Sequence, residues 1–239
     1  MKRIHLISNP RNLSTALMYS FAQRSDTQVV DEPFYGYYLT QRPNVNHPGK
    51  EDILTNMKTN SRAILEDVVF GNYNRPVLFI KNMAHHLVDL DYRFTTRLTN
   101  LFLIRNPKQL ISSIAQNIQT PTMEDIGSYR QYKMYQFLQN LGIPSVVLDS
   151  GELLKDPLGV LQKLCVALDL PFEKSMLSWE PKPLPEDGIW ARYWYRNVHQ
   201  STGFSQQPTS NRPLPAHLEE LYKTALLFYN KLHENAIQA

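Results

Sequence analysis

The chain has 239 residues, of which 42% are hydrophobic and 20% charged, so it can bury a sizeable core. Its net charge of +3 comes from 25 basic and 22 acidic residues scattered along the chain, which argues against a nucleic-acid partner. The one cysteine excludes a disulfide framework within the chain, and no apolar run reaches the roughly 18 residues that span a membrane. We expect a single soluble, cytoplasmic domain over residues 1–239.

The first predicted elements are a strand over residues 4–7, a basic turn and a helix over residues 14–24. The start of a helix carries unpaired N–H groups and partial positive charge, so it attracts anions. Arg11 adds a planar guanidinium, and Ser14 and Thr15 add hydroxyl donors. Because the turn lacks the glycines and lysine of a Walker A loop, it predicts another type of phosphate or sulfate site. The alternative is that Ser14 only caps a surface helix.

Strands and helices continue to alternate along the chain. The apolar runs 77–81 and 99–105 predict buried strands, and Asn106 and Pro107 suit the cap and first position of a helix that extends to residue 113. The other expected elements are a strand over 28–31, a loop over 41–50 that could cover a site, a helix over 52–70, a helix over 127–140, a strand over 143–149, a helix over 156–168, a Pro- and aromatic-rich wrap from about residue 176, and a terminal helix over 216–234.

This alternation predicts a three-layer α/β fold with a central parallel sheet. Ligands of such sheets bind beyond the carboxyl ends of the strands. Four of those ends carry polar residues, and we expect the four groups to converge. They are residues 9–15, 31–32, 81–86 and 105–113.

A second anion site is predicted from Arg105 and Ser113. Arg105 ends a strand, and Ser113 lies about two turns into the next helix, so both can reach one anion. Two anion sites at neighbouring strand ends suit a nucleotide that carries phosphate groups at both ends of its ribose.

In these two stretches the chain resembles the family of sulfotransferases that use 3′-phosphoadenosine 5′-phosphosulfate (PAPS), in their bacterial form. The run from Pro10 to Thr15 is similar to the family's 5′-phosphosulfate loop, and the run from Ile104 to Ser113 to its 3′-phosphate motif. The likeness covers about residues 3–175. It implies a P-loop NTPase-like sulfotransferase fold, PAPS as co-substrate, no metal, and a small-molecule acceptor with a hydroxyl or amine. The implied PAPS contacts are Arg11, Asn12, Leu13, Ser14, Thr15, Arg105 and Ser113.

The chain departs from the family in two places. Leu13 stands where glycine is common, so we expect a loop backbone without positive φ at that position. The family's Arg-Lys-Gly element near the C-terminus is not recognisable, and Arg192, Arg196 and Arg212 are the substitutes that the sequence offers.

Sulfuryl transfer needs charge stabilisation on the leaving oxygens, which suits Arg11, and a base for the acceptor proton. The resemblance implies a lysine near the end of the third strand, followed shortly by a histidine base. Lys81 would stabilise the bridging oxygen, unless it only terminates a strand. His85, with His86 beside it, is one base candidate, and Glu32 is its rival.

Two other functions stay open. One is a P-loop kinase or NTPase, and the other is a non-catalytic nucleotide-binding protein of the same fold. The aromatic residues between positions 190 and 195 either line an acceptor pocket or pack onto the sheet. A homodimer is compatible with the sequence.

Overall fold

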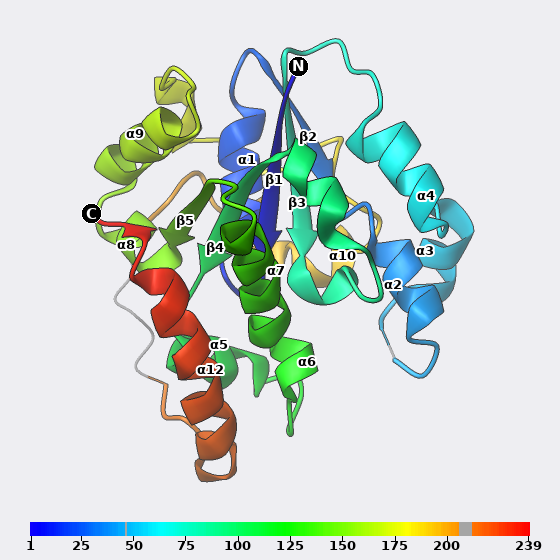
Figure 1. The fold of residues 1–239 in the computed structure, drawn as a ribbon, viewed down its shortest axis with the longest axis vertical. Coiled ribbons are helices and arrows are strands. Elements are labelled where there is room, and N and C mark those ends of the chain that lie inside the picture. Colours follow the sequence, from blue (N-terminus) through cyan, green and yellow to red (C-terminus); the bar gives the residue numbers. More distant parts are fainter. Residues whose placement is uncertain (46, 206–211) are drawn as a thin grey trace.

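The computed structural model describes residues 1–45, 47–205 and 212–239. These residues form one sheet of six parallel strands with helices on both faces (Figure 1), which confirms the predicted α/β class. The strand order is β2-β3-β1-β4-β5-β6. The strands are β1 Lys2–Ser8, β2 Thr27–Asp31, β3 Val77–Met83, β4 Thr99–Ile104, β5 Ser145–Asp149 and β6 Ala236–Ile237.

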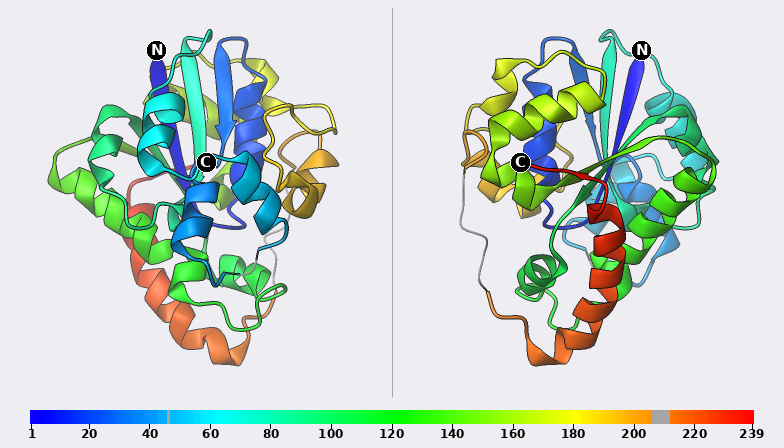
Figure 2. Two further views of the ribbon diagram at one scale, coloured as in Figure 1. Left: turned by 90° about the vertical axis from the view of Figure 1, so that its right-hand side faces the viewer. Right: turned by 60° about the vertical axis from the view of Figure 1, so that its left-hand side comes forward.

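Helices cover both faces of the sheet, with α7 in front of it and α1 behind it in Figure 1. Helix α12 contacts both α7 and α5 and stands at one side of the molecule (Figure 2). None of the described helices is both long and apolar enough to cross a membrane. The helices are α1 Ser14–Ala22, α2 Tyr35–Gln41, α3 Lys50–Asn56, α4 Ser61–Ile64, α5 Pro107–Ile114, α6 Met123–Ile126, α7 Ser128–Asn140, α8 Ser150–Lys155, α9 Pro157–Ala167, α10 Ala191–Trp194, α11 Arg196–His199 and α12 Glu219–His233.

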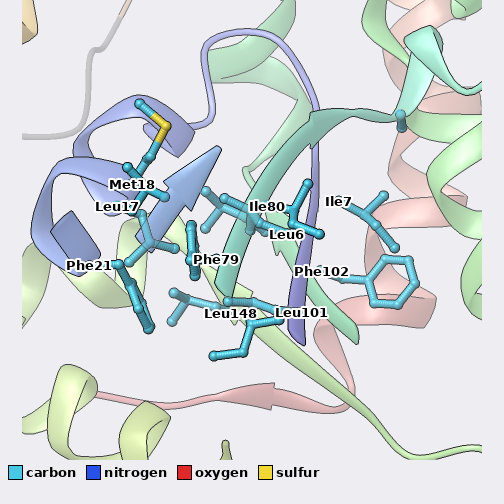
Figure 3. Packing of buried hydrophobic residues seen from close by; sticks show 14 of the residues in the cluster. Leu6, Ile7, Leu17, Met18, Phe21, Phe79, Ile80, Leu101, Phe102 and Leu148 are labelled. Carbon is cyan, nitrogen blue, oxygen red and sulfur yellow. The ribbon is translucent and has the colours of Figure 1, made fainter. Parts of the chain in front are cut away.

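The central strands are apolar on both faces because both faces are covered, and successive side chains alternate between them. On one face Phe21 of α1 stacks on Phe79 of β3, with ring centroids 4.1 Å apart. On the other face Phe102 of β4 meets Tyr135 of α7 at 5.4 Å. Figure 3 shows α1 side chains on one side and Ile7 and Phe102 on the other. This two-sided burial explains the unbroken apolar runs in the sequence.

One predicted helix is wrong in its extent. Residues 52–70 form α3, α4 and a π-helical turn over Leu65–Val69 instead of one helix. The chain becomes extended at Met57, and the Asn60 side chain accepts a hydrogen bond from the Ala63 N–H, which starts α4 anew. A polar capping residue inside an otherwise helical pattern is the signal for this break.

Other elements were not predicted. Helix α2 occupies the stretch after Glu32, α8 follows β5 because Asp149 accepts hydrogen bonds from the Gly151 and Glu152 N–H groups, and β6 adds an edge strand. The predicted loop 41–50 includes Asn46, which lies outside the described residues, and α3 begins at its end. Part of the predicted wrap, residues 206–211, also lies outside them.

The described part of the wrap packs onto the α1 side of the sheet. Ser20 of α1 donates to the Met176 carbonyl at 2.6 Å, and Tyr19 donates to Asp187 at 2.5 Å. Further along, the Gly188 N–H donates to Asp31 at the end of β2. The wrap therefore covers the carboxyl ends of β2 and β3.

Candidate functional site

The four predicted polar groups follow four strands that are consecutive in the sheet, in the order β2-β3-β1-β4. Residues 31–32 lie beside residues 81–86, these adjoin residues 9–15, and residues 9–15 in turn adjoin residues 105–113. The expected convergence at one edge of the sheet is therefore confirmed. Side-chain hydrogen bonds link these groups into two adjoining clusters.

The loop between β1 and α1 has an unusual backbone. Arg11 and Leu13 both have φ near 65°, in the left-handed region. The expectation that Leu13 avoids positive φ is therefore wrong. The loop keeps a left-handed turn at this position, which costs about 1–2 kcal/mol in conformational energy for a residue with a side chain. Turns of this kind point N–H groups into an anion-binding concavity.

The start of α1 leaves its N–H groups without partners. The cap position, Leu13, has no side-chain cap bond, and the first intrahelical bond runs from Leu17 to the Leu13 carbonyl at 3.0 Å. The N–H groups of Ser14, Thr15 and Ala16 therefore have no acceptor within the helix. An anion beside the loop would supply one.

The two predicted phosphate motifs touch each other. Arg11 Nε donates to Ser113 Oγ at 3.0 Å, and Arg105 Nη1 donates to the Arg11 carbonyl at 2.5 Å. Gln109, one turn along α5, accepts from Arg105 Nε at 3.3 Å. Residues 94 positions apart are thus held in one cluster.

This arginine cluster, made of Arg11, Arg105 and Arg212, concentrates positive charge. Within the described residues, none of the three forms an ion pair with a carboxylate. Burial, and then the charge of Arg212, lower the pKa of Arg11. Burial, Arg11 and Arg212 lower the pKa of Arg105, against a weaker opposite effect from Asp149. Like charges crowded without a counter-ion favour a bound anion.

The substitutes for the missing C-terminal element separate clearly. Arg212 lies within electrostatic range of Arg11 and Arg105. Arg192 is exposed and pairs with Asp52 of α3 instead. Arg196 is exposed and follows Tyr195, which packs at the ends of β2 and β3.

The residues predicted to contact PAPS from the loop differ in their burial. Asn12 is buried and donates through Nδ2 to the Leu103 carbonyl at 2.9 Å, which ties the loop to β4. Ser14 is buried at the start of α1, and Thr15 is half-buried. Asn12 therefore shapes the loop, whereas Ser14 and Thr15 present the N–H groups described above.

The second cluster is centred on Lys81, whose side chain is fully buried. Its ammonium donates to Asp31 Oδ1 at 2.8 Å, Glu32 Oε1 at 2.5 Å and the Tyr195 hydroxyl at 2.6 Å. Three bonds use all three of its protons. The structure thus gives Lys81 no donor free for a bridging oxygen. We call Asp31, Glu32, Lys81 and Tyr195 the lysine cluster.

Strand register builds the lysine cluster. Asp31 pairs with Lys81 across β2 and β3, and the Glu32 N–H donates to the Lys81 carbonyl at 2.8 Å. Burial raises the pKa of Glu32, and the attraction of Lys81 only partly offsets it. Burial lowers the pKa of Lys81, but the two carboxylates outweigh it and the net shift is upward. Two carboxylates therefore share one buried ammonium.

His85 and His86 lie beside the lysine cluster. A Cβ built on Gly127 would lie 2.5 Å from the Asn9 side-chain oxygen, so this glycine lets Asn9 lie close to the start of α7. His86 Nδ1 lies 3.5 Å from Glu32 Oε2. Burial lowers the pKa of His85 to about 3 and that of His86 well below its usual range, so both rings are neutral near pH 7.

A surface hollow of about 410 Å³ is lined by Arg42, Tyr92, Met123, Glu124, Tyr129, Arg130 and Lys133. Arg42 and Glu124 of this hollow form an ion pair at 3.1 Å. None of the predicted site residues lines it. Its one link to them is Arg130, whose charge contributes to the lowered pKa of His85 after burial and His47.

The aromatic group at 190–195 divides by burial. Trp190 and Tyr195 are buried, and Trp190 Nε1 donates to the Tyr195 hydroxyl at 3.1 Å. Tyr193 and Trp194 are exposed. The roles of Tyr195 in the lysine cluster and of Tyr35 and Tyr38 beside His86 were not predicted. Their sequence signal was only aromatic composition, which cannot say what a ring packs against.

The comparison with known families decides the identity. The family model for the sulfotransferase domain matches residues 1–236. The chain belongs to this family. Solved sulfotransferase structures share its fold, including the enzyme from Alicyclobacillus acidocaldarius (TM-score 0.57, 13% identity, covering 99% of this chain and 97% of that one). The sulfotransferase domain of the Synechococcus PCC 7002 olefin synthase matches with a TM-score of 0.54 at 14% identity over 94% of each chain.

Two curated relatives are more similar in sequence. The chain is 37% identical to the branched-chain-amino-acid aminotransferase-like protein 1 of Arabidopsis thaliana and 36% identical to the aminotransferase-like protein 2 of the same organism. Each match includes 97% of this chain. It covers 42% and 41% of those proteins, so it spans less than half of each relative.

Proposed function

We propose that this chain transfers a sulfuryl group from PAPS to a hydroxyl or amine of a small-molecule acceptor. The observation that carries the proposal is the arginine cluster beside the uncapped start of α1, where two anion-binding features lie side by side. Membership of the sulfotransferase family supports the reaction class. PAPS offers phosphate groups at both ends of its ribose, which is the charge pattern that this edge of the sheet fits.

Each end of the nucleotide has its own residues in this proposal. The N–H groups of Ser14 and Thr15, with Arg11, hold the 5′-phosphosulfate and take up charge on the leaving phosphate oxygen. Arg105 and Ser113, with Arg212, hold the 3′-phosphate. Because Arg11 already binds Ser113, nucleotide binding would replace that hydrogen bond with contacts to phosphate. We expect no metal requirement, because a sulfuryl group carries less charge than a phosphoryl group.

The acceptor would bind beside the 5′-phosphosulfate, within reach of a base. Its hydroxyl or amine attacks sulfur, the bond from sulfur to the phosphate oxygen breaks with its electron pair on that oxygen, and a base takes the acceptor proton. Glu32, His85 and His86 are the titratable groups close enough to one another to share this task.

Calorimetry tests the proposal. Adenosine 3′,5′-bisphosphate should bind, without magnesium, at least about tenfold more tightly than ATP, because only the bisphosphate places charge at both ends of the ribose. Magnesium-dependent binding of ATP in preference would indicate a kinase or NTPase instead. A chain that binds neither nucleotide is not the proposed enzyme. The Arg62→Ala variant, altered at an exposed arginine of α4 that pairs with Glu66, serves as control.

A further inference from the structure

Two unused polar atoms face each other beside the lysine cluster. Lys81 donates hydrogen bonds to Asp31 and to Glu32 Oε1, and Tyr195 donates to Asp31. Glu32 Oε2 receives no hydrogen bond from the described residues. His86 Nδ1 is buried, makes no hydrogen bond to any residue that the structure describes, and lies 3.5 Å from Glu32 Oε2. An approach of about 0.5 Å would make an ordinary hydrogen bond.

Two tyrosine rings pack against the His86 ring. Its centroid lies 4.4 Å from that of Tyr35 and 4.8 Å from that of Tyr38, at interplanar angles of 19° and 28°. The two tyrosine centroids are 6.5 Å apart, so both rings adjoin the imidazole without enclosing it. Tyr35 is itself hydrogen-bonded to His47. These contacts restrict rotation of the imidazole beside Glu32. The other nitrogen, Nε2, makes no hydrogen bond to the described residues and is the atom left to receive a proton.

The carboxylate is fixed as firmly as the imidazole. The Tyr195 hydroxyl accepts from Lys81 and from Trp190 and donates to Asp31 at 2.8 Å, so its hydrogen-bonding capacity is full. Lys81, gripped by Tyr195 and Asp31, keeps an ammonium 2.5 Å from Glu32 Oε1. Glu32 has φ 40°, a strained conformation of the kind found at functional sites.

Resting on the proposed sulfotransferase function, we infer that Glu32 and His86 act as one proton-accepting unit, in which Lys81 and Tyr195 are positioning residues that hold Glu32 against His86. The acceptor proton passes to His86 Nε2 as the new bond to sulfur forms, and the proton on Nδ1 strengthens its hydrogen bond to Glu32. The proton later leaves Nε2 for solvent. Lys81 acts on the carboxylate and not on the sulfuryl group.

The surrounding charges explain why the carboxylate is needed. After burial, the charges of His85, His47 and Lys81 lower the pKa of His86. Tyr35 and Tyr38 are neutral, because burial raises the pKa of both hydroxyls. Glu32 is the carboxyl group that meets the imidazole directly, and the Lys81 ammonium on its Oε1 favours its ionised form against the effect of burial, so it supplies the stabilisation that an arriving proton requires.

The first test needs neither PAPS nor an acceptor. Nitrogen-15 shifts of the histidine rings report which nitrogen carries the proton. We expect His86 to be neutral with its proton on Nδ1 in the parent protein, and to lose that preference in Glu32→Gln, where a neutral amide replaces the anion. Tyr195→Phe should show a partial loss, and His5, bonded to Asn82, should not change. A bare Nδ1 in the parent, or an identical tautomer in Glu32→Gln, would overturn the inference.

The second test is turnover, followed as release of bisphosphate from PAPS with water and with a panel of phenols, alcohols and amines. Glu32→Gln and His86→Asn should each lose about 10²–10³-fold in kcat, and the double variant should lose little more, because the two act as a unit. Bisphosphate affinity should be unchanged in all three. Turnover lost only in Glu32→Gln, or only in His85→Asn, would contradict the inference.

The two tests separate this inference from the proposed function. If the parent protein binds no bisphosphate, the proposed function fails, and the tautomer of His86 still reports whether the pair exists. If bisphosphate binds but His86 ignores the Glu32 substitution, the inference alone fails. Lys81→Met, which risks poor folding, is not required for either result.

Discussion

The two clusters at the edge of the sheet use charge in opposite ways. In the arginine cluster Arg11, Arg105 and Arg212 form no ion pair within the described part of the chain, and they stay partly open to solvent. In the lysine cluster the Lys81 ammonium is fully buried and all its protons are bound. Uncompensated charge near the surface calls for a ligand, whereas compensated charge in the interior fixes geometry.

The difference arises because the wrap covers the ends of β2 and β3 but not those of β1 and β4. The wrap places Tyr195 and Gly188 over the ends of β2 and β3, while the ends of β1 and β4 meet the start of α1 and the first turns of α5. One sheet edge thus provides a charged ligand site and, beside it, a dry group of titratable residues.

The largest effect is expected at the lysine cluster. Lys81→Met should lower the free energy of unfolding by about 3–5 kcal/mol, because it leaves two carboxylates buried together. The matched control is Lys58→Met at the exposed Lys58–Asp67 pair, which has the same 2.8 Å distance and should cost less than about 1 kcal/mol. Urea denaturation measures both. Equal losses in the two variants would show that burial does not distinguish the pairs.

The next largest effect is expected on nucleotide binding. Arg105→Ala should weaken bisphosphate binding about 100-fold, since it removes a charged phosphate donor and the hydrogen bond that holds the Arg11 carbonyl. The free energy of unfolding should change little, because Arg105 forms no ion pair with a carboxylate in residues 1–45, 47–205 and 212–239. Calorimetry against the Arg62→Ala control measures the difference. If the Arg105→Ala variant kept its affinity for the bisphosphate, the arginine cluster would not be part of the nucleotide site.

A smaller loss is expected at Arg212. This residue adds charge to the cluster but makes no hydrogen bond to Arg11 or Arg105, so Arg212→Ala should weaken bisphosphate binding about tenfold. Arg192→Ala, on the same wrap but paired with Asp52, should leave affinity unchanged. If Arg192 and Arg212 had the reverse effects, the 3′-phosphate would lie at the other end of the wrap.

The smallest effect is expected at Leu13. Leu13→Gly relieves the left-handed strain and loses leucine contacts, so we expect a stability change within about 1 kcal/mol and bisphosphate affinity within about threefold of the parent. The loop binds through N–H groups that glycine keeps. Loss of binding in this variant would mean that the leucine side chain itself shapes the site.

The sequence was sufficient to locate β1 to β5 and the strand ends from which the candidate phosphate-binding residues project. Apolar runs located β1, β3 and β4, and Asn106 and Pro107 located the start of α5, so Arg105 and Ser113 could be placed at a strand end and on a helix. The hydrophobic period carries no information on which polar side chains bond to one another, so the separate arginine and lysine clusters were not predicted. The burial of Lys81 also depends on its pairing with Asp31 and on Tyr195, 114 residues away.

A crystal structure with adenosine 3′,5′-bisphosphate tests the division of the two clusters most directly. We predict one phosphate on Arg105 and Ser113, the other on the N–H groups of Ser14 and Thr15, and Lys81 still bound to Asp31, Glu32 and Tyr195. A phosphate on the Lys81 ammonium, or a nucleotide bound away from the arginine cluster, would contradict the account.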